Sequence, residues 1–180
     1  MPLPLTIKCN GFELRVFQLS DAEPLAEIEF DPEVKQFLAI PAKRKDEWIE
    51  GIRNLGISGW VIQTDGQVAG SASIKLANLR GDRELRIVIG RAFWGRALGT
   101  RVAAVVIKVA FEQLSAKAVI GVVHPENKAS LRLLRLFKFR RRGVVQDHKP
   151  PWQYGHFIYR LTRKAYSLST ELKANGVHKA

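Results

Sequence analysis

One stretch of the chain, residues 84–99, constrains the fold more than any other. It begins with a mostly apolar run at 85–89, which predicts a buried strand. Three glycines then interrupt the pattern: Gly90, Gly95 and Gly99. From 98 to 114, apolar side chains recur at spacings of mostly three and four, which predicts a helix of about five turns. The sequence therefore predicts a strand, a glycine-containing turn and a long helix in succession.

A turn of this kind can bind an anion. The first backbone N–H groups of a helix have no internal partner, and the helix macrodipole adds partial positive charge there. Small residues let a phosphate or pyrophosphate approach these N–H groups, and Arg91, Arg96 and Arg101 would add positive charge. An ordinary turn between a buried strand and a core helix is the alternative. The G-x-G-x-x-G spacing of a dinucleotide site is absent.

Two motifs carry a family resemblance. The first is Phe93-Trp94-Gly95-Arg96-Ala97-Leu98-Gly99-Thr100, preceded in the strand by Glu84-Leu85. The second is Pro125-Glu126-Asn127-Lys128-Ala129-Ser130, followed by Leu131-Arg132-Leu133-Leu134 and by Phe139. In this order and at this separation they resemble the GNAT superfamily, in particular its RimJ/RimL-type branch of ribosomal-protein N-terminal acetyltransferases. A weaker match extends from about Phe12 to Arg163.

The resemblance implies a fold and an activity. The fold is a single domain over 1–180, with its core at about 12–163 and a polar C-terminal tail at 164–180. It is of the mixed α/β (α+β) class, with a mostly antiparallel, twisted central sheet flanked by about four helices. One parallel strand pair is expected to splay apart at the acetyl-CoA site. The implied activity is transfer of an acetyl group from acetyl-CoA to a primary amine, by direct attack in a ternary complex.

The resemblance also implies site residues. Glu84 is the candidate general base, acting directly or through water, and Ser130 is the candidate to help the departing sulfur. A bulge at 87–89 would free a backbone N–H to polarise the thioester carbonyl. His124 is an alternative base, or it simply ends a strand. The expected acetyl-CoA contacts are Ile87, Val88, Ile89, Trp94, Gly95, Arg96, Ala97, Leu98, Gly99, Thr100, Asn127 and Ser130.

Each main candidate also has a purely structural interpretation. Glu84 can be a surface strand residue paired with Arg83 or Arg86. Asn127, the candidate contact to the pantetheine amide, can be no more than a helix N-cap. Ser130 can be a helix-packing residue. The residue types alone therefore leave both interpretations open at each of these positions.

Several positions depart from the family pattern. Ala97 stands where the loop usually has glycine; alanine would be strained at positive φ and harmless in the first helical turn. Leu134 stands where the family often has a tyrosine general acid, so that acid is absent here. Arg86 and Lys138 replace usual glycines, and Trp94 replaces a frequent glutamine or arginine.

Charge is distributed unevenly along the chain. The net charge is +12, with −2 over 1–90 and +14 over 91–180. The basic half can face the phosphates of CoA, or it can bind nucleic acid. The same choice applies to a run of seven cations without one acid: Lys128, Arg132, Arg135, Lys138, Arg140, Arg141 and Arg142. The segment 23–33 is acidic instead, and is either a solvated face or a lip that attracts a cationic amine.

Three functions therefore remain in view. The branch resemblance favours a protein or peptide N-terminal amine as the acceptor. A small amine such as a polyamine, an amino acid or an aminoglycoside is the second candidate. A non-catalytic, basic RNA- or ribosome-binding module on the same fold is the third. The oligomeric state, monomer or homodimer, is left open.

Local patterns predict the remaining elements. Strands are expected at 12–17, 60–64, 67–74, 118–123, 139–146 and 152–161, and helices from Ser20-x-x-Glu23 to about 31, at 46–55 and at 127–136. Asp65-Gly66 predicts a tight hairpin turn. The strand at 118–123 should run parallel to the strand at 85–89, because a helix separates them. The tail from about Ser167 is expected to fray.

Composition limits the other possibilities. The single cysteine, Cys9, is incompatible with an internal disulfide framework and fits a reducing compartment. No apolar run approaches the roughly 20 residues of a membrane span, and the start lacks the pattern of a signal peptide. We therefore expect a cytoplasmic protein with no membrane partner. The four histidines lack metal-ligand spacing, so no metal is expected.

Overall fold

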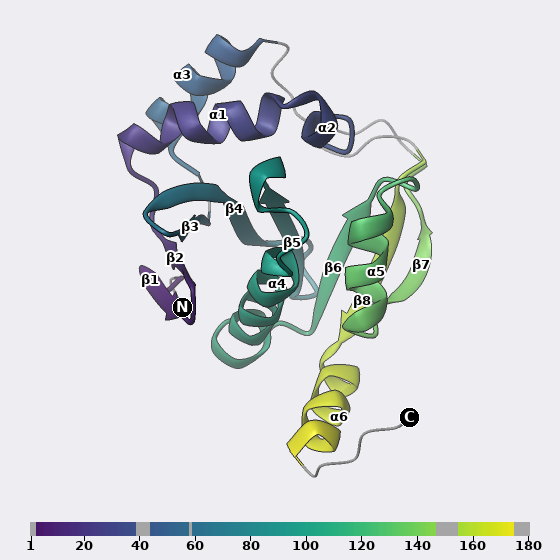
Figure 1. The fold of residues 1–180 in the computed structure, drawn as a ribbon. Coiled ribbons are helices and arrows are strands. Elements are labelled where there is room, and N and C mark those ends of the chain that lie inside the picture. The colour runs from purple at the N-terminus through teal and green to yellow at the C-terminus, as the bar shows by residue number, and fades with distance from the viewer. Residues whose placement is uncertain (1–2, 39–43, 58, 147–154, 175–180) are drawn as a thin grey trace.

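A single twisted sheet organises the molecule. The computed structural model describes residues 3–38, 44–57, 59–146 and 155–174. Within them, eight strands form one sheet (Figure 1), in the order β1 (Thr6–Cys9), β2 (Phe12–Arg15), β3 (Trp60–Thr64), β4 (Gln67–Leu76), β5 (Asp82–Ile89), β6 (Ala118–Val123), β8 (Phe157–Thr162) and β7 (Arg140–Val144). The mixed α/β class predicted from the sequence is confirmed.

Strand pairing matches the predicted topology. Every neighbouring pair is antiparallel except β5 and β6, which are parallel. Asp65 and Gly66 join β3 to β4 with φ values of 50° and 75°, as a tight hairpin turn of the primed type requires. Strand β1 was not predicted from the sequence. Part of the segment predicted as the last strand, 152–154, lies outside the described residues.

Six α-helices occur in the described part of the chain, whereas about four were expected. They are α1 (Ala22–Phe30), α2 (Pro32–Lys35), α3 (Lys45–Leu55), α4 (Leu98–Lys108), α5 (Lys128–Leu136) and α6 (Arg163–Ala174). The extra helix α2 is one short turn that begins at Pro32, where the carboxylate of Asp31 accepts from the N–H of Glu33 at 2.9 Å. Ahead of α1, the carboxylate of Asp21 accepts from the N–H of Gln18 at 2.7 Å, so the predicted box at Ser20 is not the one used.

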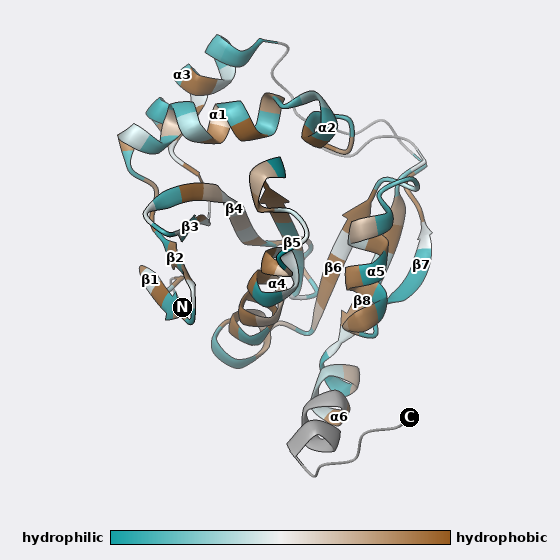
Figure 2. Ribbon diagram, in the orientation of Figure 1, coloured by the Kyte–Doolittle hydropathy of each residue, from teal (hydrophilic) through white to brown (hydrophobic). Residues whose placement is uncertain are grey.

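The core lies between the sheet and α4. Val102 and Val106 of α4 are fully buried and belong to the same apolar cluster as Trp60 of β3. A π-helical segment (Val109–Gln113) continues α4 and buries Phe111. Figure 2 shows that β6 is apolar along its length, whereas the edge strand β7 is hydrophilic. No helix of the described residues is long and apolar enough to cross a membrane.

The segment expected to fray is helical up to Ala174. In α6 the ring of Tyr166 stacks on the ring of Phe111, with their centroids 4.6 Å apart. The guanidinium of Arg163 donates to the main-chain oxygen of Ala116 at 3.2 Å and to that of Phe111. These contacts attach the start of α6 to the core. These contacts precede Ser167, so fraying of the segment from Ser167 onwards stays a prediction.

Candidate active site

The central feature of the site is the point at which β5 and β6 separate. Their parallel pairing covers only Asp82–Ala118, Arg83–Val119 and Glu84–Ile120. Beyond Glu84, β5 continues to pair with β4 on its other side up to Ile89, and β6 continues to pair with β8 up to Val123. The two strands therefore diverge, and the predicted splayed parallel pair is present.

Alternate residues of β5 direct their main-chain groups towards β4 or towards the gap between β5 and β6. The N–H of Gly90 donates to the oxygen of Ala69 at 2.9 Å, and the β4–β5 register continues without a shift. In an antiparallel ladder every second residue bonds the partner strand. Val88 therefore bonds β4, whereas Ile87 and Ile89 direct their main-chain groups away from it. The predicted bulge at 87–89 was wrong, and strand separation exposes these groups instead.

The glycine-containing turn leads into α4 through two residues with left-handed backbone. Gly95 has a φ of 75° and Ala97 a φ of 54°, and Ala97 is the N-cap of α4. Of the two possibilities for Ala97, the strained one is observed. The first intrahelical bond runs from the N–H of Arg101 to Ala97. The preceding N–H groups of the first turn, at 98–100, therefore have no partner within the helix.

A cavity of about 710 Å³ connects the turn, the separated strand β5 and the start of α5. Every residue predicted to contact acetyl-CoA lines this cavity except Arg96. Trp94 is 44% exposed, and its indole N–H donates to the main-chain oxygen of Ile89 at 2.8 Å. That bond fixes the turn against the end of β5. The structure thus brings together residues from motifs some thirty positions apart in the sequence.

The cations beside this cavity differ from those predicted. Arg91 pairs with Glu33 at 2.5 Å, and Arg101 donates to the main-chain oxygen of Asn10 at 2.8 Å. The guanidinium of Arg96 lies 5.9 Å from the centroid of the Phe93 ring. The cations that do line the cavity come from α5, and they are Lys128 and Arg132. Spacing along the turn could not show this, because side-chain direction changes at each of its irregular residues.

Asn127 fixes the start of α5. Its Oδ1 accepts from the N–H of Ser130 at 3.0 Å, so Asn127 is the N-cap. This bond uses only the side-chain oxygen, and the amide N–H groups of Asn127 do not take part in it. Leu134, one turn further on, is buried, and one of its methyl carbons would lie 2.9 Å from a β-carbon placed on Gly121. Leu134 therefore fills apolar space close to β6.

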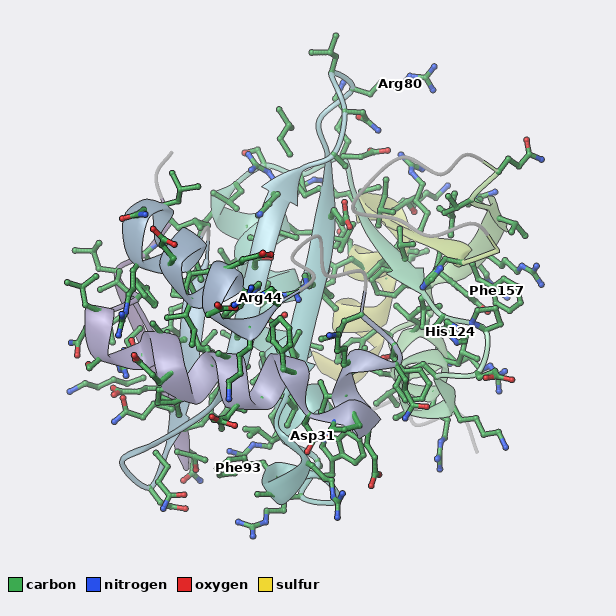
Figure 3. All side chains as sticks on the ribbon, turned by 90° about the horizontal axis from the view of Figure 1, so that it is seen from above. Asp31, Arg44, Arg80, Phe93, His124 and Phe157 are labelled. Atoms are coloured by element: carbon green, nitrogen blue, oxygen red, sulfur yellow. The ribbon has the colours of Figure 1, made fainter. Side chains whose placement is uncertain are left out.

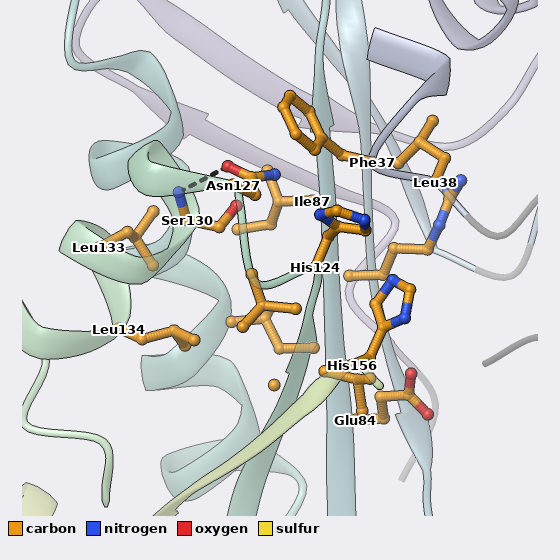
Figure 4. A pocket seen from close by; sticks show the side chains of 15 residues that line it. Phe37, Leu38, Glu84, Ile87, His124, Asn127, Ser130, Leu133, Leu134 and His156 are labelled. Carbon is orange, nitrogen blue, oxygen red and sulfur yellow. Dashed lines mark hydrogen bonds between the residues drawn. The ribbon is translucent and has the colours of Figure 1, made fainter. Parts of the chain in front are cut away.

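A second cavity, of about 160 Å³, lies at the point of strand separation. Glu84, Arg86, His124 and His156 line it, together with Asn127 and Ser130. Figure 4 shows Glu84 and His156 on one side of this pocket and Asn127 and Ser130 on the other, with Ile87 between them. Figure 3 shows Arg80 and Phe93 at opposite ends of the β5 region. The residues of β5 that line the pocket, 84–87, lie between these two positions in the sequence.

The two histidines face each other at the pocket. Their ring centroids lie 5.2 Å apart at an interplanar angle of 81°, and His156 is 6% exposed. The Nδ1 of His124 accepts from the N–H of Glu126 at 3.2 Å, so in the neutral ring the proton is on Nε2. That hydrogen bond occupies the Nδ1 lone pair of His124. His156 was not predicted as a site residue, because no motif surrounds it.

The acidic segment at 23–33 is mostly paired. Salt bridges join Glu23 to Arg53, Glu27 to Lys45 and Glu33 to Arg91. The first two connect α1 to α3, next to an edge-to-face contact between Phe30 and Trp48. All three carboxylates remain more than half exposed, which agrees with the solvated-face interpretation, and they are also paired with cations of the chain. No group of three or more metal-binding side chains occurs among the described residues.

Comparisons with known proteins agree with this geometry. The family model described as acetyltransferase (GNAT) domain matches residues 12–140. The uncharacterized N-acetyltransferase p20 of Bacillus licheniformis is 24% identical over 155 residues, which cover 80% of this chain and 87% of that protein.

Three solved structures share the fold. A GNAT-family acetyltransferase from Bacillus anthracis is 17% identical, with a TM-score of 0.75 over 88% of this chain and 99% of that one. Mycobacterium smegmatis RimJ in complex with CoA-disulfide is 17% identical, with a TM-score of 0.71 over 92% of this chain and 89% of that one. Spermidine N-acetyltransferase from Vibrio cholerae, in complex with CoA and spermine, is 15% identical, with a TM-score of 0.72 over 88% of this chain and 99% of that one. The match over 12–140, together with the separated strands, shows that this chain belongs to the GNAT family of acetyltransferases.

Proposed function

We propose that this protein is an acetyl-CoA-dependent N-acetyltransferase whose acceptor is a protein or peptide N-terminal amine. The observation that supports this most strongly is the continuity of one cavity from the start of α4 to the separated strand β5. Its volume of about 710 Å³ lies within the range of small-molecule sites, roughly 300–1,000 Å³. The RimJ/RimL-type motifs at 93–100 and 125–130 favour the N-terminal amine.

The residues present suit the chemical groups of acetyl-CoA. The N–H groups at the start of α4 suit a pyrophosphate, and Lys128 and Arg132 add cations on the opposite wall. The exposed main-chain groups of Ile87 and the N–H of Ile89 suit the amides of a pantetheine arm. The side-chain N–H groups of Asn127 can bind a pantetheine carbonyl.

The proposed chemistry assigns one task to each residue near the smaller cavity. Acetyl-CoA supplies an acetyl group activated as a thioester. Glu84 accepts the proton that the ammonium must lose before its nitrogen can attack, directly or through water. The main-chain N–H of Ile87 donates to the carbonyl oxygen as negative charge develops on it. As the carbon–sulfur bond breaks, the hydroxyl of Ser130 donates its proton to the departing sulfur and takes up the second proton that the acetylated nitrogen loses. Holding both reactants in line supplies much of the remaining rate.

A small amine is the second candidate acceptor. The fold likeness to spermidine N-acetyltransferase, at a TM-score of 0.72, is as close as the likeness to RimJ. Polar groups in the smaller cavity can hold an amine of either origin. The charges at the opening of the smaller cavity therefore decide whether a peptide N-terminus or a small amine is the better acceptor.

Calorimetric titration with acetyl-CoA tests the cofactor site. A Gly95→Glu variant places a negative charge beside the expected phosphates, and we expect it to abolish micromolar binding. Gly66→Glu is a matched control, because Gly66 also has a φ of 75° and an added β-carbon meets nothing within 4 Å at either glycine. Equal affinities in the two variants, or no binding by the wild type, would contradict the proposal.

The proton acceptor is tested on the same protein. We expect Glu84→Gln to keep its affinity for acetyl-CoA and to lower kcat by roughly 100-fold, which is the low end for general-base catalysis. The loss should shrink at high pH, where more of the amine is already neutral. A variant with wild-type kcat at neutral pH would remove Glu84 from the mechanism.

A further inference from the structure

An ion pair between α1 and β5 lies beside the acceptor pocket. The guanidinium of Arg86 donates to the two carboxylate oxygens of Glu29 at 3.0 and 2.6 Å. The side chain of Glu29 is 3% exposed, whereas that of Arg86 is 43% exposed. The hydroxyl of Ser71 lies 3.5 Å from the same carboxylate. Glu29 is thus buried beneath the arginine, and the arginine faces outward.

Such a pair is poorly explained by stability alone. Removing a carboxylate from water costs several kcal/mol, and its attraction to a partner often only offsets this penalty. The pair does restrict the geometry of Arg86, since a bidentate contact fixes the plane of the guanidinium. It uses one N–H of each terminal nitrogen. Three of the five N–H donors of Arg86 are outside this contact.

Arg86 and Glu84 lie on the same side of β5. Residues two apart in a strand share a face and are separated by roughly 7 Å. Both line the smaller cavity. In the proposed mechanism the amine binds at Glu84, so a second group on the same acceptor can reach Arg86.

Among the described residues, the carboxylates of α1 and α2 do not favour a polycationic acceptor. The carboxylates of Glu23, Glu27 and Glu33 are already paired with cations of the chain. Glu29 is paired with Arg86 itself. A polyamine would therefore meet an exposed guanidinium in the pocket, and like charges repel there.

We propose that Arg86 is a specificity-determining residue that binds a carboxylate or phosphate on the acceptor, close to the amine that is acetylated. This inference rests on the proposed N-acetyltransferase function. The required chemistry is an amine and an anion within about one residue's length of each other. An acidic residue at the start of a peptide provides it, and so does a small amino acid.

Matched acceptors that differ by one charge test this inference. One arm uses peptides that carry Asp, Asn or Lys as the second residue. The other arm uses 4-aminobutyrate against butylamine, with spermidine as the polycation. We expect kcat/KM to favour the anionic acceptor over its neutral counterpart at least tenfold in one arm, and that arm identifies the source.

The Arg86→Gln variant should reduce this preference to within about twofold of unity, mainly through a higher KM for the anionic acceptor. Because this single substitution would leave Glu29 buried without its partner, the double variant Arg86→Gln with Glu29→Gln is measured as well, and it should behave alike. Arg83→Gln is the matched control: Arg83 lies on the opposite face of β5 and lines neither cavity. It should keep the wild-type preference.

The outcomes separate this inference from the proposed function. If acetyl-CoA does not bind, the proposed function fails and the inference fails with it. If acetyl-CoA binds and amines are acetylated without a preference for the anion, only the inference fails. The same holds if Arg86→Gln keeps the preference. If acetyl-CoA binds and neither arm contains an acceptor, the inference fails and the acceptor class of the proposed function is contradicted with it.

Discussion

At the scale of single residues, Ala97 has a strained backbone conformation. Its φ of 54° and ψ of 13° lie in the left-handed helical region, which costs an L-residue roughly 1–2 kcal/mol. The residue caps α4 at the point where the N–H groups of that helix face the larger cavity. The family's usual glycine would adopt this conformation without strain.

We therefore expect Ala97→Gly to raise the free energy of unfolding by about 0.5–1 kcal/mol. Relief of roughly 1–2 kcal/mol of strain is partly offset by the greater freedom of glycine in the unfolded chain. Urea denaturation, followed by circular dichroism, measures the difference.

Ala104→Gly provides the opposite case in the same helix. Ala104 is exposed and lies inside α4, where glycine destabilises a helix by roughly 1 kcal/mol. The two Ala→Gly changes should thus move stability in opposite directions. If both lower it, Ala97 is not strained in solution.

At the scale of elements, the junction of β5 with β6 and β8 has its own support. Arg160 of β8 donates to the carboxylate of Asp82 of β5 at 3.0 and 3.1 Å, and Asn78 donates to it at 3.3 Å. Asp82 is 5% exposed. The hydrogen bonds from Arg160 lower the pKa of Asp82 below its usual value of 3.8, although burial opposes this.

Stability should therefore depend on the charge of Asp82. A lowered pKa contributes stability that is fully present above the unfolded value, near 4, and is lost as pH falls through the lower folded value. We expect Asp82→Asn to lower the free energy of unfolding by about 2 kcal/mol at pH 7. The difference from the wild type should shrink towards pH 3 in urea titrations.

Asp46→Asn is the comparison for this prediction. The Arg44–Asp46 pair is also a salt bridge, but both of its side chains are more than 60% exposed. Exposed pairs contribute little to stability, so this variant should unfold like the wild type across the pH range. A difference for Asp82→Asn that is independent of pH would mean that packing, and not charge, supports the junction.

The sequence predicted elements with strong periodicity and missed those without it. The apolar periodicity of α4 and the buried run of β6 identified both elements, and Asp65-Gly66 identified the hairpin. The short helix α2 and the largely polar α6 carry no such pattern, and the sequence cannot reveal a contact such as Tyr166 on Phe111.

The same limit applies within the site. All but one of the residues predicted to contact acetyl-CoA line the larger cavity, because a strand, a turn and two helix starts position them locally. Val34, Phe37 and Leu38, which also line it, come from a distant part of the chain and were not predicted. The pair Arg86–Glu29 joins residues 57 positions apart, and His156 reaches the pocket only through strand pairing. The directions of the Arg91 and Arg101 side chains, which keep both residues out of the lining of the larger cavity, also depend on the three-dimensional structure.

At the scale of the whole molecule, two groups of cations in the basic half lie in different places. Lys128 and Arg132 line the larger cavity, whereas Arg140, Arg141 and Arg142 lie exposed on the edge strand β7. Arginines on an open edge discourage pairing with another chain. They are also available to a polyanion such as RNA, which we keep as a proposal for a possible ribosomal partner.

The two groups should separate in binding experiments. We expect Lys128→Gln with Arg132→Gln to weaken acetyl-CoA binding about tenfold or more, since a charged hydrogen bond contributes roughly 1.5–3 kcal/mol. Changing all three β7 arginines to glutamine removes more charge, yet should leave the affinity within about twofold. Calorimetry at two salt concentrations measures both.

An equal loss of acetyl-CoA affinity in both variants would indicate that the overall positive charge of the protein, and not local contacts from α5, attracts the ligand. If the wild type binds RNA with a steep salt dependence and the β7 variant does not, the edge strand is a polyanion surface. Retention of RNA binding in the β7 variant would exclude that surface.

The short pairing of β5 with β6 also leaves an inner edge of the sheet open. Three residue pairs and the Asp82–Arg160 contact join β5 to β6 and β8. A ligand that carries amides can pair with the vacant edge at Ile87 as a strand would. We therefore expect the bound reactant to extend the sheet across the gap between β5 and β6, and the gap to be vacant again once the product has left.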